Sequence, residues 1–190
     1  MIRIDEAVSI AASVEGFMQW HELYWLADKA STRNTVLELG SWKGRSTKAL
    51  ALVCPGTVYA VDHWKGSESE IKTNHSEARN MGPDRFFEIF KANLKGEIQK
   101  NKVIPIRAES QEAVNILGRE RGFRWVDMLF IDGDHMYESV KRDIQLWKHF
   151  VVPGGLLCGH DFFDAPGVRQ AVKELLPNYI EGSIWSYIVP

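Results

Sequence analysis

Five short apolar runs follow one another at wide spacing along the chain, and most of them are rich in β-branched or aromatic residues. They occupy residues 35–39, 57–61, 102–106, 126–131 and 156–159. Between them the apolar residues recur at helical steps. Val140, Ile144 and Trp147, for example, share one face of a predicted helix over 137–150. The alternation of strand and helix predicts an α/β fold, with a mostly parallel sheet and helices on both faces.

Three segments stand outside this pattern. Residues 7–30 read as one or two helices rich in aromatic side chains, which either pack onto the sheet or cover a ligand. Residues 64–83 form a long irregular stretch of the kind that is often functional in a compact domain. Residues 180–189 break at Gly182 and then alternate, which predicts a closing hairpin at the sheet edge. The expected organisation is one domain, 1–190, with a helical cap over 1–34 and a core over 35–190.

Composition and charge narrow the possible partners. A chain of 190 residues fits one α/β domain. Its formal net charge of -2 and its interspersed charges exclude a basic stripe of the kind that tracks a phosphate backbone, so no nucleic acid is expected. No run resembles a secretory signal or a membrane span, and Cys54 and Cys158 do not make a disulfide framework. A cytoplasmic protein is expected.

A glycine-containing turn follows the first predicted strand. In ELGSWKGRST (38–47), Gly40 permits a sharp turn and close backbone approach, and the helix beyond Gly44 offers amide donors. The P-loop fits badly because only three residues separate these glycines and Arg45 follows instead of lysine. The dinucleotide fingerprint fits badly because Trp42 occupies the place of its middle glycine.

Two acidic residues near this turn indicate what it binds. Glu38 would repel a pyrophosphate but could hold a cationic group, and Asp62 ends the second strand. Asp62 lies 22 residues after Gly40, close to the spacing of about 20 at which an acid accepts both hydroxyls of a ribose. The pair therefore favours a nucleoside with positive charge and without phosphate, and S-adenosylmethionine is such a molecule.

A second polar cluster follows the fourth predicted strand. The sequence IDGDH places Asp132, Asp134 and His135 behind an apolar run. A calcium loop fits poorly, because its glycine is misplaced and a helical pattern starts at Tyr137. An Asp-x-Asp site of a sugar-nucleotide transferase lacks a phosphate cradle. The remaining interpretation is the reacting end of a buried strand, with Asp134 capping the next helix.

The motifs taken together resemble a known family. ELGSWKGRST, YAVDHWKGS, RAESQEAV, FIDGDHMYESVKRDIQLW and VPGGLLCGHDFFDAPGV occur in this order. They are similar to class I S-adenosylmethionine-dependent methyltransferases, and most similar to methyltransferase family 24, related to the catechol and macrolide-sugar O-methyltransferases. The likeness runs from about Thr35 to the C-terminus. It implies a Rossmann-like three-layer sandwich with a seven-stranded sheet whose last strand is antiparallel.

The resemblance also implies site residues. The methionine side of the cofactor would lie against Glu38, Gly40, Ser41, Gly44 and Ser46, and Asp62 would take the ribose. His63, Trp64, Glu109 and Ser110 would border the adenine, and Asp132 would lie at the reacting end of the cofactor site. Trp42 departs from the family pattern, since many members have glycine there, and this leaves the path of the turn open.

The resemblance further implies a divalent metal in related enzymes. Here Asp132, His160 and Asp161 would form a mixed set for Mg²⁺, Mn²⁺ or Zn²⁺, although His160 stands where those relatives have an acid. His135 is the candidate base for the acceptor proton, with Asp161 as metal ligand or second base. A structural His135 beside the helix start is the alternative.

These features predict a small O-methyltransferase acting on a hydroxylated acceptor such as a sugar or a natural product. The alternatives are an S-adenosylmethionine-binding protein without transferase activity and a metal-dependent glycosyltransferase. The expected partner is a small-molecule acceptor, with no membrane partner, and a homodimer is left open. The sequence does not identify the acceptor.

Overall fold

The computed structural model describes residues 2–65, 84–119, 123 and 125–190. Its sheet has the strand order β3-β2-β1-β4-β5-β6. The strands are β1 (Thr35–Leu39), β2 (Thr57–Asp62), β3 (Val103–Arg107), β4 (Val126–Ile131), β5 (Val151–Gly159) and β6 (Trp185–Ile188). All neighbours are parallel except β5 and β6, which are antiparallel. The expected α/β, Rossmann-like fold with an antiparallel last strand is therefore confirmed.

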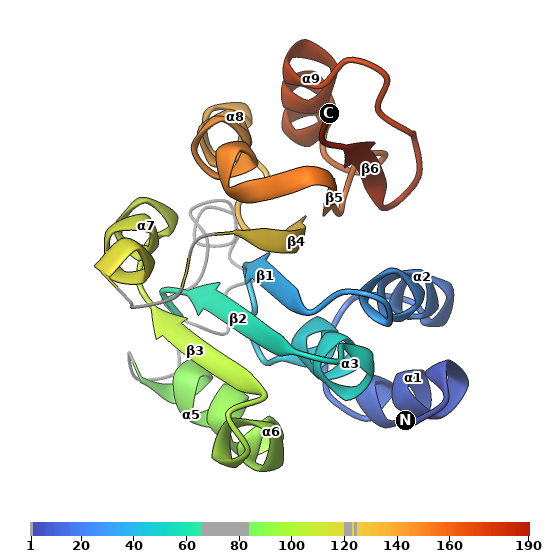
Figure 1. Ribbon diagram of the computed structural model, residues 1–190, viewed down its shortest axis with the longest axis vertical. Coiled ribbons are helices and arrows are strands. Elements are labelled where there is room, and N and C mark those ends of the chain that lie inside the picture. The colour runs from blue at the N-terminus through green and yellow to red at the C-terminus, as the bar shows by residue number, and fades with distance from the viewer. Residues whose placement is uncertain (1, 66–83, 120–122, 124) are drawn as a thin grey trace.

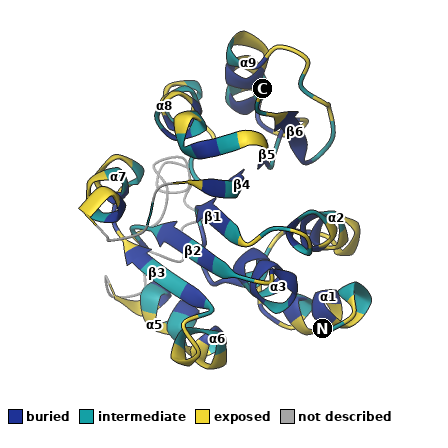
Figure 2. Cartoon of the chain, in the orientation of Figure 1, coloured by how far each residue is buried: buried dark blue, intermediate teal, exposed yellow. Residues whose placement is uncertain are grey.

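Helices cover both faces of this sheet (Figure 1). One face carries α1 (Ile4–Ala12), α2 (Trp20–Ala30), α3 (Arg45–Val53), α5 (Arg85–Asn93) and α6 (Lys95–Gln99), and the other carries α7 (Ser110–Arg119), α8 (Tyr137–Trp147) and α9 (Pro166–Leu175). A short 3-10 turn, Lys148–Phe150, follows α8. The inward sides of the helices are buried and their outward sides exposed (Figure 2).

The alternation of side chains along the strands divides the core in two. In β1, Val36 packs with the α1–α3 face, while Leu37 and Leu39 pack with the α7–α9 face. In β4, Phe130 packs with the α1–α3 face and Leu129 packs with the α7–α9 face. This is the two-residue period of a strand buried on both sides, so the apolar runs of the sequence are explained by a central position in the sheet.

The strand count differs from the expectation of seven. In the described part of the chain the sheet has six strands, because β6 pairs directly with β5 and occupies its free edge. The segment between them contains α9 and a bridge between Ile180 and Ser186. That bridge confirms the closing hairpin at the sheet edge.

Strand β5 begins earlier than the predicted run 156–159. It includes Gly154 and Gly155, where the pairing register with β4 shifts between Val126 and Met128. The first residue pair of that strand is therefore Val126 with Val151. Of the irregular stretch 64–83, residues 66–83 lie outside the described residues. Within the described ranges no helix is both long enough and apolar enough to cross a membrane.

Candidate functional site

The carboxyl ends of the central strands meet at one edge of the sheet. The strand ladder continues one residue past each strand: Gly40 N–H donates to Val61 O, Asp132 N–H to Leu39 O, and His160 N–H to Ile131 O. These hydrogen bonds, 2.8 to 3.1 Å long, bring residues far apart in sequence to the same edge. Ligands of open α/β sheets bind at this edge.

The turn after β1 depends on Gly40. Its φ of 90° lies in the left-handed region, and a Cβ there would overlap the backbone carbonyl oxygen of Asp132. Gly44, with φ 91°, precedes α3, and a Cβ on it would meet the Leu94 side chain. Both glycines are therefore required by backbone conformation and by close packing.

Trp42 lies in the same turn and adopts the backbone conformation that the turn requires. Its φ of 41° is left-handed, a conformation that glycine adopts easily, which agrees with the glycine found there in many family members. The Trp42 N–H donates to Asp62 Oδ2 at 2.8 Å, and the ring stacks on Phe17 with centroids 5.1 Å apart. These contacts hold a bulky residue where the backbone is strained.

Glu38 lies beneath the turn and is fully buried. Its Oε2 accepts hydrogen bonds from Ser41 Oγ, at 2.6 Å, and from Thr47 Oγ1, and Ser46 is a further partner. Burial raises the pKa of Glu38 to about 7 against these hydrogen bonds, and nearby Asp132 adds to the rise. The carboxylate thus ties the turn to the first residues of α3.

We expect the substitution Glu38→Gln to remove a pH dependence of stability. Because the folded-state pKa lies above the ordinary value of 4.5, the wild-type free energy of unfolding falls as pH rises through about 7. The full difference is about 3 kcal/mol, from about 1.4 kcal/mol for each pKa unit. Urea unfolding at pH 4.5 and pH 8 should show Glu38→Gln gaining stability relative to wild type over this range. The exposed Glu112→Gln is the control, and parallel curves for Glu38→Gln and wild type would contradict the assignment.

Asp62 ends β2 with both carboxylate oxygens oriented by backbone amides. Oδ2 accepts from Trp42 and Oδ1 accepts from Trp64, and the Ser41 amide is a further donor to this carboxylate. Burial raises the pKa of Asp62, although these hydrogen bonds oppose the rise. The partly exposed His63 imidazole accepts the N–H of Lys65 through Nδ1 at 2.9 Å. Asp62 and His63 therefore remain at the strand end as the sequence predicted.

The other three positions assigned to the adenine border behave differently. The Trp64 ring is buried between Phe87 and Phe90, and its Nε1 donates to the Trp42 carbonyl oxygen at 2.7 Å. Ser110 Oγ accepts from Trp147 Nε1 at 2.8 Å and so faces α8. Glu109 is exposed just before α7. The structure thus places the Trp64 ring in the core.

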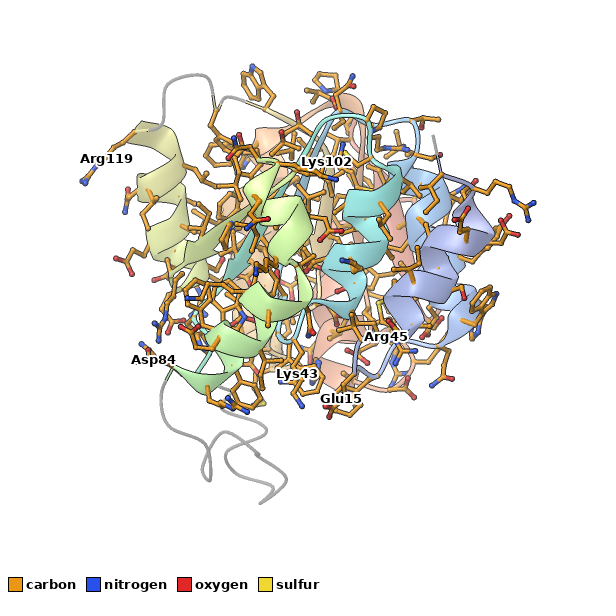
Figure 3. The ribbon with its side chains drawn as sticks, turned by 90° about the horizontal axis from the view of Figure 1, so that it is seen from below. Glu15, Lys43, Arg45, Asp84, Lys102 and Arg119 are labelled. Carbon is orange, nitrogen blue, oxygen red and sulfur yellow. The ribbon has the colours of Figure 1, made fainter. Side chains whose placement is uncertain are left out.

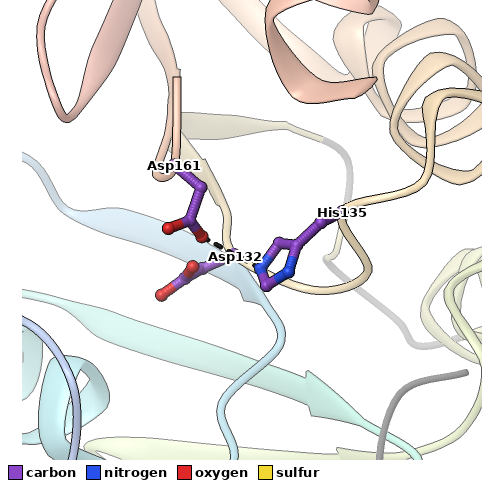
Figure 4. A group of neighbouring side chains, drawn as sticks. All are labelled: Asp132, His135 and Asp161. Atoms are coloured by element: carbon purple, nitrogen blue, oxygen red, sulfur yellow. Dashed lines mark ion pairs between the residues drawn. The ribbon is translucent and has the colours of Figure 1, made fainter. Parts of the chain in front are cut away.

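A cluster of carboxylates and imidazoles lies at the ends of β4 and β5. Asp132, His135 and Asp161 offer one ligand atom each, all within 4.8 Å of one another (Figure 4). His135 Nε2 lies 2.9 Å from Asp161 Oδ2. Asp161 itself has a left-handed φ of 61°. The two residues of IDGDH predicted to be chemically active, Asp132 and His135, are therefore brought together with Asp161.

His160 occupies the interior side of the cluster, with one ring nitrogen toward the two aspartates of the expected metal set and the other toward α2. Its Nδ1 lies 3.2 Å from Asp161 Oδ1 and 3.7 Å from Asp132 Oδ1, while Nε2 lies 3.1 Å from Glu22 Oε1. Glu22 belongs to α2 and is 7% exposed. It was missed by the sequence reading. The only signal was an acid on the buried face of an aromatic helix, which does not identify its partner.

The electrostatics of the cluster follow from burial and opposite charge. Burial alone would lower the pKa of His160, but its contacts with Asp161, Asp132 and Glu22 outweigh this and raise it to about 10. The Asp161 contact raises the pKa of His135 despite burial. Burial raises the pKa of Asp132 to about 6, and the two histidines outweigh burial at Asp161 and lower its pKa.

Asp134 has a role different from the expected cap. The N-cap residue of α8 is Met136, which makes no side-chain cap. Asp134 instead accepts the His135 N–H at 2.8 Å and the Ser139 hydroxyl at 2.8 Å. It shapes the turn that carries His135.

The connection between α1 and α2, residues 13–19, lies against the glycine turn (Figure 3). Three pairs join them: Glu15 with Lys43, Gly16 with Arg45, and Phe17 with Trp42. The Lys43 ammonium, on a side chain that is 3% exposed, lies 2.8 Å from Glu15 Oε1 and 4.3 Å from the Trp42 ring centroid. The connection between α1 and α2 therefore contacts the glycine turn through three consecutive residues.

The chain matches the model of a known protein family. A family model described as a methyltransferase domain, numbered 24 among such families, matches residues 37–162. Among curated proteins, an uncharacterized protein of Acanthamoeba polyphaga mimivirus is 35% identical over 65 residues. The matched segment is 33% of this chain and spans only 29% of that protein's length.

Two solved structures illustrate the shared fold. An O-methyltransferase from Bacillus cereus, in complex with S-adenosylhomocysteine, has a TM-score of 0.67 at 15% identity, covering 97% of this chain and 90% of the other. The O-methyltransferase TomG from Streptomyces achromogenes, involved in tomaymycin synthesis and solved with S-adenosylmethionine, has a TM-score of 0.67 at 15% identity, covering 100% and 92%. At such identities the likeness concerns the fold.

Proposed function

We propose, from the premise that this chain belongs to methyltransferase family 24, that it transfers a methyl group from S-adenosylmethionine to a hydroxyl of a small acceptor. The observation that carries the proposal is the single edge at which Gly40, Asp62 and the Asp132–His135–Asp161 cluster meet. A nucleoside cradle and a set of proton-handling groups lie side by side there. The solved relatives with bound S-adenosylmethionine or S-adenosylhomocysteine support the choice of cofactor.

The residues at the end of β1 and β2 suit this cofactor. Gly40 lets the turn pack closely against the Asp132 backbone, and backbone amides hold the carboxylate of Asp62 at the strand end where a ribose diol would bind. The turn has an acidic residue, the buried Glu38, beside it, which does not suit a phosphate-binding turn. Glu38 supports the turn from below, since its hydrogen bonds go to residues of the chain. When bound, S-adenosylmethionine supplies an electrophilic methyl group on a positively charged sulfur.

His135 is suited to remove the acceptor proton. A hydroxyl attacks slowly unless its proton leaves, and a positioned imidazole is the commonest group that takes it. Asp161 engages Nε2 of His135, which leaves Nδ1 as the atom available to the acceptor. The imidazole is 43% exposed and so remains accessible at the rim of the site. Asp161 acts as the group that orients the base.

A resident divalent ion fits the cluster less well than the ligand types alone suggest. The donor atoms of Asp132, His135 and Asp161 are close enough, but Asp161 is already engaged on one oxygen by His135 and on the other by His160. An ion would have to displace these ion pairs. We therefore propose that the acceptor proton passes to His135 without the participation of a metal ion.

Calorimetric binding of S-adenosylmethionine tests the cofactor assignment. We expect micromolar affinity for the wild type and a loss of at least about 10-fold for Asp62→Ala, because two charge-assisted hydrogen bonds to the ribose are removed. The exposed Asp28→Asn on α2 should bind as the wild type does. Absence of binding at high micromolar cofactor would refute the methyltransferase proposal.

Two additions to the same titration separate the alternatives. We expect the affinity for S-adenosylmethionine to change less than about twofold when Mn²⁺ or Mg²⁺ is added. A large metal-dependent increase in this affinity would show that a bound ion takes part in cofactor binding. A nucleotide sugar should not bind, and tight binding would favour glycosyl transfer. Cofactor binding without product from any hydroxylated acceptor would favour the non-catalytic binding protein.

A further inference from the structure

Four side chains form an alternating series of carboxylate and imidazole that runs from α2 to the loop after β4. Glu22 Oε1 lies 3.1 Å from His160 Nε2, and His160 Nδ1 lies 3.2 Å from Asp161 Oδ1. Asp161 Oδ2 then lies 2.9 Å from His135 Nε2. His160 thus has a carboxylate beside each ring nitrogen, and Asp161 has an imidazole beside each carboxylate oxygen.

The inner end of the series is anchored. The other carboxylate oxygen of Glu22, Oε2, accepts the backbone N–H of Gln19 at 2.7 Å, and Ser183 contributes a further hydrogen bond. Glu22 lies on the buried side of α2, so its carboxylate has little freedom to rotate. The outer end, His135, is the most exposed of the four side chains.

The series has a geometric consequence for the candidate base. A flip of the His160 ring would exchange its two nitrogens between Glu22 and Asp161, so the position of Glu22 influences which nitrogen is turned to Asp161. The two oxygens of Asp161 are divided between the two histidines, so the orientation of His160 limits that of Asp161. Asp161 in turn selects the nitrogen of His135 that is left for the acceptor.

We propose that Glu22 is a positioning residue for His135, acting through His160 and Asp161. The role assigned to His135 rests on the proposed function, but the coupling between Glu22 and His135 is a property of the folded chain alone. The helical cap over residues 1–34 thereby contributes a side chain to the site through contacts that lie far apart in sequence.

The test is nitrogen NMR of the imidazole rings in protein labelled with ¹⁵N-histidine, at one pH and without any ligand. In Glu22→Gln the amide can still accept from Gln19, but it places either an N–H₂ group or a neutral oxygen against His160. We expect displaced ring-nitrogen resonances for both His160 and His135, and unchanged resonances for the exposed His149. Asp28→Asn, which removes a carboxylate from the exposed side of the same helix, should leave both site histidines unchanged.

A displaced His160 with an unaltered His135 would overturn the proposal, because the coupling would then end at the first contact. Should Glu22→Gln fail to fold, His160→Gln tests the same series from its second member, with His135 as the reporter. The NMR samples contain no cofactor. A failure of S-adenosylmethionine binding would therefore refute the proposed function and leave the coupling between Glu22 and His135 intact.

Discussion

Replacing His135 with glutamine is expected to lower the rate of methyl transfer by about 10²- to 10⁴-fold, the usual contribution of a positioned general base. Glutamine retains polarity and similar volume, but it has no lone pair that can take a proton at neutral pH. Because Asp161 raises the pKa of His135, the wild-type rate should increase with pH as the imidazole loses its proton. Asp132 and Asp134 also face this imidazole and raise its pKa in the same direction.

The measurement is release of S-adenosylhomocysteine with a panel of catechols, sugars and other hydroxylated acceptors. His149→Gln is the matched control, because His149 is exposed and lies just before β5, at the opposite end of that strand from Asp161. Cofactor affinity should be similar in both variants. A His135→Gln enzyme that keeps its rate and its pH profile would assign the proton to another group.

The substitution Gly40→Ala should destabilise the fold by about 2 to 5 kcal/mol. A side chain in the left-handed region costs about 1 to 2 kcal/mol, and a methyl group forced against the Asp132 carbonyl adds about 1 to 3 kcal/mol of overpacking. This is a large share of the roughly 5 to 15 kcal/mol that holds a typical domain together. The same overlap would separate β1 from β4 where the cofactor is proposed to bind.

Urea unfolding checks this expectation, with Gly118→Ala as the control. Gly118 lies in α7 with open space around its Cβ position, so alanine there should be neutral or stabilise by up to about 1 kcal/mol. If Gly40→Ala were as stable as Gly118→Ala, the close contact between the turn and Asp132 would not exist in solution.

The residues at strand ends were the part of the site that sequence could predict. Gly40, Asp62, Asp132 and Asp161 each follow an apolar run, and parallel strands end at a common edge, so their approximate meeting place follows from the pattern. Side-chain direction at such positions is not encoded locally. Trp64 illustrates this, because its ring turned into the core toward Phe87 and Phe90 and not toward the edge.

By itself, the sequence determined the α/β class, the order of its elements and the strand ends that carry polar residues, because periodicity and spacing are local properties of a chain. The tertiary structure alone decided the strand count, the burial of Glu38 and the partner of His160. Glu22 reaches His160 only because α2 packs beside the end of β5, and no local pattern records such a contact. Long-range packing thus selected which imidazole faces the interior and which, His135, remains at the surface of the site.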